Sequence, residues 1–303
     1  MNVIETSGLG KRYRHAWALR ECTLAIPAGH VAALVGPNGA GKTTLLNLAV
    51  GLATPTAGVV TVLGGRPAGS PDALDGIAFV AQDTPLYESL SVTDMLHLTR
   101  NLNRHFDQGY ARARLAELGI PLGKKTGKLS GGQQAQLALT LALARRPRLL
   151  VLDEPLANLD PLARHDFMAT VMAAAAEDGM SVVLSSHVLA ELERVADYLI
   201  LLSRGRVQLA GEVDGLLASH RLLTGPAAEA DRYTGPPVVH ARRAAAQAHL
   251  LVRAPADDPV PPGWEAHPVG LEELALAYLR EPGAAALPGP ARDRAAEPSE
   301  VTR

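Results

Sequence analysis

Two short segments of the sequence combine residue types that could bind and activate phosphate groups. The first, residues 36–43, matches the pattern G-x-x-x-x-G-K-[ST] in full and lies between an apolar segment and a helical one. Glycines let backbone N–H groups wrap around phosphates, and the amino end of the following helix adds a favourable dipole. In such a loop Lys42 reaches the β- and γ-phosphates of a nucleotide, and Thr43 is a ligand of Mg²⁺. The residues expected to line the phosphates are Gly36, Pro37, Asn38, Gly39, Ala40, Gly41, Lys42, Thr43 and Thr44.

The second segment is a pair of acids, Asp153 and Glu154, directly after the apolar residues Leu149–Leu152. A buried strand would hold both carboxylates rigidly at its carboxyl end, where ligands of open α/β sheets bind. Alone, such a pair is more often a helix cap or part of a turn. After a phosphate loop it indicates acid–base chemistry, because a carboxylate can accept a proton.

Three further polar segments lie where they could contact the same ligand. Gln82 follows the apolar run Ile77–Val80, and His187 follows the run 182–186. Residues 129–133 read Leu-Ser-Gly-Gly-Gln and open a predicted helix, whose amino end favours a phosphate. Each has an ordinary alternative, namely a surface glutamine, a core histidine and a serine N-cap followed by loop glycines.

The order of these motifs resembles the ATP-binding subunit of an ABC transporter, and the resemblance implies ATP and Mg²⁺ as ligands. It implies that Asp153 holds Mg²⁺, mostly through water, and that Glu154 is the general base that polarises the attacking water. Gln82 resembles the Q-loop glutamine, whose amide contacts Mg²⁺ or water. His187 resembles the H-loop histidine, which hydrogen-bonds the γ-phosphate and orients water.

The resemblance also implies a second ATP-binding subunit. In the family, Ser130, Gly131 and Gly132 grip the γ-phosphate of ATP held by a partner subunit in a head-to-tail dimer. Asp160 resembles the D-loop residue that touches the opposite protomer, although it can equally be the N-cap before Pro161. The chain would then hold parts of two ATP sites and complete neither alone. Its partner can be a copy or a different chain.

Two features are less well defined by the resemblance. Tyr13 resembles the aromatic residue that stacks on adenine, but Trp17 is a near competitor and a plain packing role is an alternative. After residue 133 the chain continues Gln134-Ala135-Gln136-Leu137, where transporter ATPases often carry basic residues. No phosphate-facing group is lost, so this departure concerns contact with the membrane partner.

The resemblance favours an exporter whose permease is a separate chain. The segment Gly270-Leu271-Glu272-Glu273-Leu274 resembles the tail of ABC-2 or drug-exporter subunits, and residues 86–92 lie where the family docks the permease's coupling helix. The alternatives are an importer ATPase, a soluble ABC ATPase acting on DNA or ribosomes, and a non-catalytic regulator. A net charge of −2 and the lack of tandem ATPase domains, long coiled coils and zinc sites disfavour the soluble ATPase, so no nucleic-acid partner is expected. The intact phosphate loop and acids disfavour the regulator.

Short apolar strands alternating with helices must position these groups. The alternation predicts an α/β fold with a largely parallel sheet. The resemblance implies that this is a P-loop NTPase core, accompanied by an antiparallel β subdomain and by a helical subdomain at about residues 84–146. Ser91 and Asp94 resemble a capping box, and Met95, Leu98 and Leu102 give that helix an apolar face. The predicted strands and helices of the core are strands Val31–Val35, Ile77–Val80, Leu149–Leu152 and 182–184, helices 42–50 and 161–178, and a closing hairpin of 198–202 with 207–210.

Composition divides the chain into three parts. Residues 1–220 carry the motifs, and residues 221–280 read as a small α+β accessory domain with a strand at 250–253. That domain would end in a helix with apolar positions at Leu271, Leu274, Tyr278 and Leu279. Residues 281–303 are rich in Ala, Pro and charge and are expected to be disordered.

Bulk properties point to an ordinary globular protein of the cytoplasm. The chain has 303 residues and a single cysteine, Cys22, which rules out an intrachain disulfide and is expected to be a core residue. No segment approaches the roughly 18 apolar residues of a membrane span, and the start of the chain lacks the features of a signal peptide. Contact with the inner face of the membrane would therefore pass through the permease.

Overall fold

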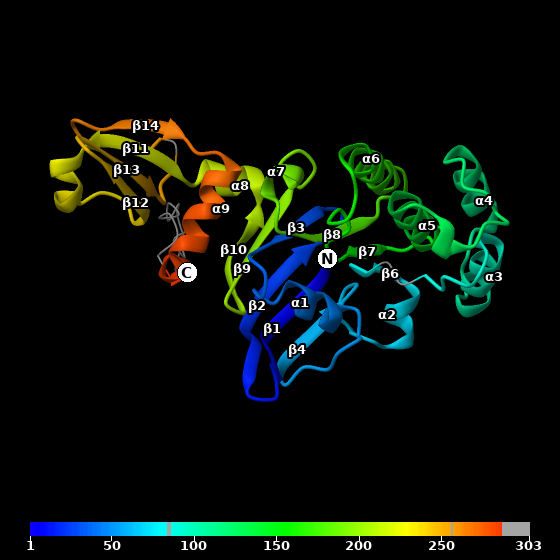
Figure 1. Ribbon diagram of the computed structural model, residues 1–303. Coiled ribbons are helices and arrows are strands. Elements are labelled where there is room, and N and C mark those ends of the chain that lie inside the picture. The colour runs from blue at the N-terminus through cyan, green and yellow to red at the C-terminus, as the bar shows by residue number, and fades with distance from the viewer. Residues whose placement is uncertain (84–85, 256, 287–303) are drawn as a thin grey trace, which may run out of the picture. The chain divides into compact units, whose positions relative to one another are not determined.

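The computed structural model describes residues 1–83, 86–255 and 257–286, and the chain forms two compact units (Figure 1). The division falls between Glu212 and Val213, whereas composition placed it after residue 220. The reason is helix α8 (Val213–Ala218), which packs against helix α9 (Leu271–Arg280) of the second unit.

The first unit is built on a six-stranded sheet with the strand order β10-β9-β3-β8-β7-β6. All neighbours pair in parallel except β10, which pairs antiparallel with β9 as the predicted hairpin. Every residue of β3, β7, β8 and β9 is buried, as expected for strands covered on both faces. The strands are β3 (Val31–Val35), β6 (Ile77–Val80), β7 (Leu149–Leu152), β8 (Ser181–Ser186), β9 (Tyr198–Ser203) and β10 (Arg206–Glu212).

An antiparallel sheet of order β2-β1-β4-β5 forms the second layer of this unit, as predicted. Helix α1 (Lys42–Ala49) lies between the two sheets, because its leucines share one core with residues of both. Cys22 is fully buried in that core. The strands are β1 (Asn2–Tyr13), β2 (Ala16–Pro27), β4 (Ala57–Val62) and β5 (Arg66–Pro67).

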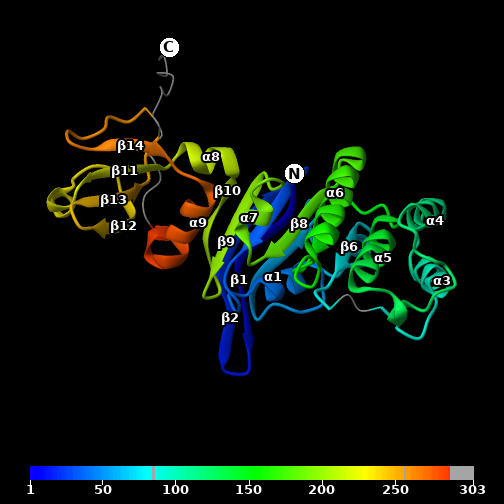
Figure 2. The same cartoon turned by 45° about the horizontal axis from the view of Figure 1, so that its top comes forward.

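Helices α3, α4 and α5 form a separate cluster with its own apolar core, beside the β6 end of the sheet (Figure 2). The predicted capping box of Ser91 and Asp94 is present at the start of α3. Met95, Leu98 and Leu102 were predicted to form the apolar face of this helix, but Leu102 does not pack in the core: it is 75% exposed, because α3 ends there and buries only Val92, Met95 and Leu96. The remaining elements of the unit are α2 (Pro71–Asp75), α3 (Val92–Leu102), α4 (Gln108–Glu117), η1 (Thr126–Lys128), α5 (Gly131–Leu143), α6 (Pro161–Asp178) and α7 (Leu189–Leu192).

The second unit is an antiparallel sheet of order β12-β13-β11-β14 with α8 and α9. One face buries a small core around Leu250 and Trp264. A short 3₁₀ helix, η3 (Pro282–Ala286), buries Ala284 where the composition predicted a disordered tail from residue 281. Residues 287–303 of that predicted tail lie outside the described residues. The other elements are β11 (Arg221–Pro226), η2 (Ala227–Arg232), β12 (Val238–Ala244), β13 (Gln247–Val252) and β14 (Glu265–Pro268).

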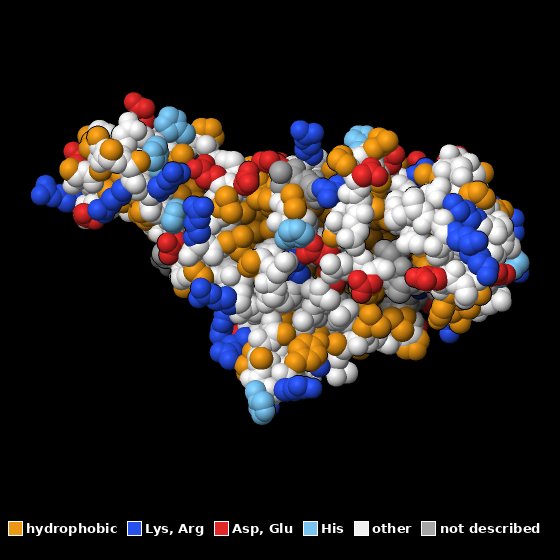
Figure 3. Space-filling model, in the orientation of Figure 1, with side chains coloured by type: hydrophobic (Ala, Val, Ile, Leu, Met, Phe, Trp, Pro, Cys, Tyr) orange, Lys and Arg blue, Asp and Glu red, His pale blue; other side chains and the backbone are white. Residues whose placement is uncertain are grey.

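On the face shown in Figure 3, the basic side chains of the described residues do not form one continuous area. Lys and Arg side chains are interspersed there with Asp and Glu side chains. Among the helices of the described part of the chain, none combines the length and the apolar character needed to cross a membrane.

A buried histidine makes the second unit sensitive to pH. His220 is 2% exposed, its Nε2 lies 2.8 Å from the Tyr278 hydroxyl, and burial lowers its pKa below the ordinary value of 6.5. The unfolded chain therefore takes up a proton at a higher pH than the folded chain. This contribution to stability is complete above about pH 6.5 and is lost as pH falls below it, by up to about 1.4 kcal/mol per pH unit.

We expect the thermal unfolding of this unit, followed in the full chain, to shift to lower temperature between pH 7.5 and 5.5. His220→Gln should lower the unfolding temperature of the unit at pH 7.5. The difference in unfolding temperature between this variant and the wild type should become smaller as pH falls to 5.5. His165→Gln, at a histidine with an 81% exposed side chain, is the control. Parallel pH curves for wild type and His220→Gln would contradict this expectation.

Candidate nucleotide site

A cleft of about 460 Å³ gathers most of the residues that the motifs predicted. It lies at the carboxyl ends of β3 and β7, where ligands of parallel sheets bind. Gly36, Pro37, Asp153 and the segment 129–133 do not line it. The lining residues are Tyr13, Ala18, Asn38, Gly39, Ala40, Gly41, Lys42, Thr43, Thr44, Gln82, Glu154, Ala157 and His187.

The phosphate loop needs glycine at its two ends for steric reasons. A Cβ atom at Gly36 would lie 2.2 Å from the carbonyl oxygen of Leu202, so no side chain fits there. Gly41 has a φ of 108°, a left-handed conformation that glycine tolerates, and forms the N-cap of α1. No side chain caps α1, and its first residues, 42–44, line the cleft, so the N–H groups of the first turn can bind an anion there.

Lys42 is a buried cation held between the loop and an acid. Its side chain is 6% exposed, and Nζ donates to the carbonyl oxygen of Gly36 at 2.8 Å. Nζ also lies 3.1 Å from Oε1 of Glu154, whose side chain is 9% exposed. A buried charge needs such a partner, and these two charges satisfy one another.

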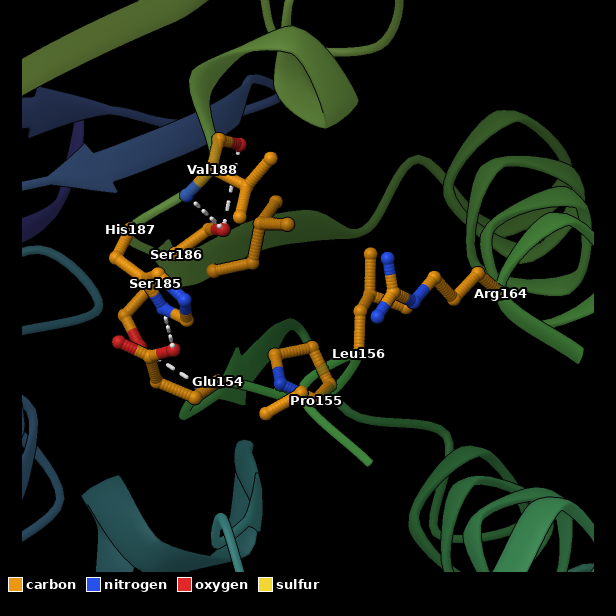
Figure 4. A pocket seen from close by; sticks show the side chains of 10 residues that line it. Glu154, Pro155, Leu156, Arg164, Ser185, Ser186, His187 and Val188 are labelled. Atoms are coloured by element: carbon orange, nitrogen blue, oxygen red, sulfur yellow. Dashed lines mark hydrogen bonds and ion pairs between the residues drawn. The ribbon is translucent and has the colours of Figure 1, made fainter. Parts of the chain in front are cut away.

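The carboxylate of Glu154 contacts side chains from two other parts of the chain, Lys42 of the phosphate loop and His187 after β8. Its second oxygen, Oε2, lies 2.6 Å from Nδ1 of His187, at the end of β8 (Figure 4). The backbone of Glu154 has a φ of 48°, a strained conformation for a residue with a side chain. Lys42, Glu154 and His187 thus form one connected chain of charged or titratable groups.

Ser185 is a residue of the site that the sequence analysis missed. Its hydroxyl donates to Oδ1 of Asp153 at 2.6 Å and accepts the backbone N–H of Glu154 at 2.8 Å. The available signal was weak: a serine two positions before His187, at the end of an apolar run. Only the pairing of β7 with β8, in which Leu152 lies opposite Leu184, brings this hydroxyl to the acids.

The two aromatic candidates for adenine lie differently. Tyr13 lines the cleft and is 49% exposed, whereas Trp17 is not among the lining residues. The Trp17 ring has the guanidinium groups of Arg12 and Arg20 each 5.6 Å from its centroid. Packing of Trp17 against these arginines accounts for its position without a ligand.

The segment 129–133 lies outside the cleft, at the start of α5. Ser130 is the N-cap, and its hydroxyl accepts the N–H of Gln133 at 3.2 Å. Asp160 is the N-cap of α6, accepting the N–H of Ala163 at 2.9 Å, so its predicted capping role is confirmed. The segment lies beside the chain before α6, because a Cβ atom at Gly131 would be 3.8 Å from the carbonyl oxygen of Asn158.

These features place the chain in the P-loop class of α/β nucleotide-binding proteins, and comparison with known proteins defines the family. Residues 19–157 match the family model described as ABC transporter. The chain is 32% identical over 233 residues to an uncharacterized ABC transporter ATP-binding protein of a Nostoc species, covering 72% of this chain and 69% of that protein. The chain belongs to the ATP-binding proteins of ABC transporters, which hydrolyse ATP to power transport.

Other relatives differ in the direction of transport that their names state. Identity is 38% over 224 residues with the probable multidrug ABC transporter ATP-binding protein YbhF of Escherichia coli, covering 71% of this chain and 38% of YbhF. The chain is 34% identical over 234 residues to the phosphonates import ATP-binding protein PhnC of Thiobacillus denitrificans, a match that covers 70% of this chain and 88% of PhnC. The comparisons therefore assign the chain to the ATP-binding subunits of ABC transporters, but they do not assign it to the exporter subtype.

Solved structures confirm the predicted fold class. An ATP-binding subunit of an ABC transporter superposes with a TM-score of 0.64 at 29% identity, covering 71% of this chain and 91% of that one. The dimeric bacterial ABC transporter cassette MJ0796 superposes with a TM-score of 0.61 at 27% identity, covering 69% and 98%. Neither match covers the whole chain, since about 30% of its residues lie outside each superposition.

Proposed function

We propose that this chain hydrolyses ATP in the cleft around Lys42, with Glu154 as the general base, and thereby powers a separate membrane permease. The observation that carries the proposal is the chain of contacts from Lys42 through Glu154 to His187. A cation, a base and a histidine meet there at the end of a phosphate loop, which suits phosphoryl transfer to water.

The contacts suggest an order of events. Lys42 and His187 both contact the Glu154 carboxylate, and a γ-phosphate entering the cleft would compete for both. Once they turn to the phosphate, the carboxylate is released to accept a proton from the attacking water. The water oxygen bonds to the γ-phosphorus as the bond to the ADP oxygen breaks, and Lys42 stabilises the charge on the phosphates.

Mg²⁺ would be held in this cleft by Thr43 and Gln82 together with phosphate oxygens, and by Asp153, which does not line the cleft, mostly through water. Asp153 is 2% exposed at the end of β7, and Thr43 and Gln82 line the cleft. Within the described residues no three His, Cys, Asp or Glu side chains gather as metal ligands, so an ion here needs oxygens from the nucleotide. That donor set suits Mg²⁺, which binds with few protein ligands, and the ion would neutralise phosphate charge.

A head-to-tail dimer would complete the site. Ser130 and Gly131, at the amino end of α5, are exposed and do not line this chain's own cleft. We propose that Ser130, Gly131, Gly132 and Asp160 contact ATP bound in a partner subunit. Support comes from the similar cassette MJ0796, which is dimeric.

A groove of about 350 Å³ is the proposed docking site for the permease, which would hold this chain at the inner face of the membrane. Leu86, the first residue of the predicted docking segment 86–92, lines it. Leu52 also lines the groove and is 69% exposed, so the groove offers an apolar surface to a partner helix.

We propose export as the direction of transport. Support comes from the resemblance of segment 270–274 to exporter subunits and from identity with a multidrug transporter protein. Import is the second candidate direction, because the chain is also similar to PhnC, which is named as an import ATP-binding protein. In inside-out membrane vesicles the cytoplasmic face points outward. ATP-dependent accumulation of the transported substrate inside these vesicles would support export, and ATP-dependent release of the substrate from them would support import.

Glu154→Gln should keep ATP binding and lower the hydrolysis rate by about 100- to 10,000-fold, because an amide cannot accept the proton. The variant should also trap a closed dimer, measured by gel filtration with ATP. Lys42→Ala is the contrasting variant and should lose nucleotide binding. Hydrolysis by Glu154→Gln at the wild-type rate would refute the assignment of the base.

Tyr13→Ala should weaken ATP binding by about 5- to 150-fold, which corresponds to the loss of one base stack at roughly 1–3 kcal/mol. Trp17→Ala should leave the affinity unchanged, since Trp17 is outside the cleft. Calorimetry with ATP and with tripolyphosphate distinguishes loss of adenine stacking from a general loss of phosphate binding, because tripolyphosphate has no base. Equal weakening of both ligands by Tyr13→Ala would contradict stacking.

Leu86→Glu and Leu52→Glu should release the chain from the membrane fraction and leave the ATPase activity of the purified chain intact. A buried carboxylate in an apolar interface is costly, so docking is lost. Leu102→Glu is the control, because Leu102 is exposed outside the groove. Retention of all three variants on membranes would place the docking site elsewhere.

A further inference from the structure

Ser185 connects the two acids of the site through a single hydroxyl group. It is completely buried near the end of β8. Its O–H donates to Oδ1 of Asp153 at 2.6 Å, a short bond to a charged acceptor. The same oxygen accepts the N–H of Glu154 at 2.8 Å.

The conformation of Glu154 makes the second bond important. At a φ of 48° its backbone is strained, and such a conformation persists only where the surroundings hold it. The Ser185 oxygen supplies a partner for the Glu154 N–H in that conformation. It is the conformation in which the side chain reaches both Lys42 and His187.

We propose that Ser185 is a positioning residue for ATP hydrolysis, which orients Asp153 and fixes the backbone of Glu154 at the same time. The inference rests on the proposed roles of these two acids. The hydroxyl occupies Oδ1 of Asp153. In this proposal Oδ2 remains available to interact with a cation bound with ATP. A hydroxyl is required because only it donates and accepts at one atom.

The test compares substitutions at two serines of the same strand. Ser185→Ala removes both bonds, and Ser185→Thr keeps a hydroxyl. Ser181→Ala is the matched control: Ser181 is 3% exposed at the other end of β8, and its hydroxyl oxygen accepts the N–H of Gly29 at 2.8 Å. It too loses a buried bond to a backbone N–H, but it does not touch the acids.

We expect Ser185→Ala to lower kcat for ATP by about 10- to 100-fold with little change in KM, as for other groups that orient ligands of a metal. Ser185→Thr should recover most of the activity. Ser181→Ala should lower the unfolding temperature and leave kcat unchanged. Equal kcat values for Ser185→Ala and Ser181→Ala would overturn the proposal.

Calorimetry provides a readout besides activity. The gain in ATP affinity on adding Mg²⁺, relative to ATP in EDTA, should shrink in Ser185→Ala and persist in Ser181→Ala. An unchanged gain would remove the Asp153 half of the proposal.

A double-mutant cycle separates this inference from the proposed function. In the Glu154→Gln background, Ser185→Ala should cause a smaller loss of kcat than in the wild type, because one of the two groups that it positions is absent and only Asp153 remains. A full additional loss would show that Ser185 acts independently of Glu154. If Glu154→Gln itself hydrolyses ATP normally, the proposed function fails. If that variant is inactive but Ser185→Ala is fully active, only the role of Ser185 fails.

Discussion

The buried pairing of Lys42 with Glu154 is the interaction on which the site depends. Both side chains are less than a tenth exposed, and their charged atoms are 3.1 Å apart. Removing one partner of such a pair leaves an uncompensated buried charge, at a cost of about 3–5 kcal/mol. Under the proposed function, this pairing holds the lysine where the phosphate would arrive and the acid where the water would be activated.

The parallel sheet makes this pairing possible. Lys42 follows β3, Glu154 follows β7, and His187 follows β8, which lies between those two strands in the sheet order. Carboxyl ends of parallel strands meet at one edge, so residues distant in sequence converge there. The strained backbone of Glu154 lies at this edge, and its N–H donates a hydrogen bond to the Ser185 hydroxyl oxygen on the neighbouring strand β8.

Much of the core could be predicted because its signals are local. The buried strands, the helix caps at Ser91 and Asp160, and the phosphate loop each depend on a few consecutive residues. Predictions were weakest in the second unit, where strands such as β11 and β12 are short and partly exposed. Their pairing partners rather than their own composition stabilise them. The exposure of Leu102 was missed for a similar reason, since neither helix length nor periodicity shows what packs beside the last turn.

The sequence by itself determined which chemical groups are present and in what order: a phosphate loop, a Ser-Gly-Gly segment, paired acids and a histidine. That order was sufficient to predict the family and the fold class. Only the tertiary structure decided which of these groups meet. It brought Tyr13 rather than Trp17 to the cleft, left Ser130 outside the cleft, and put Ser185 between the acids. The physical reason is that strand register and side-chain direction are set by long-range pairing, which a run of consecutive residues does not specify.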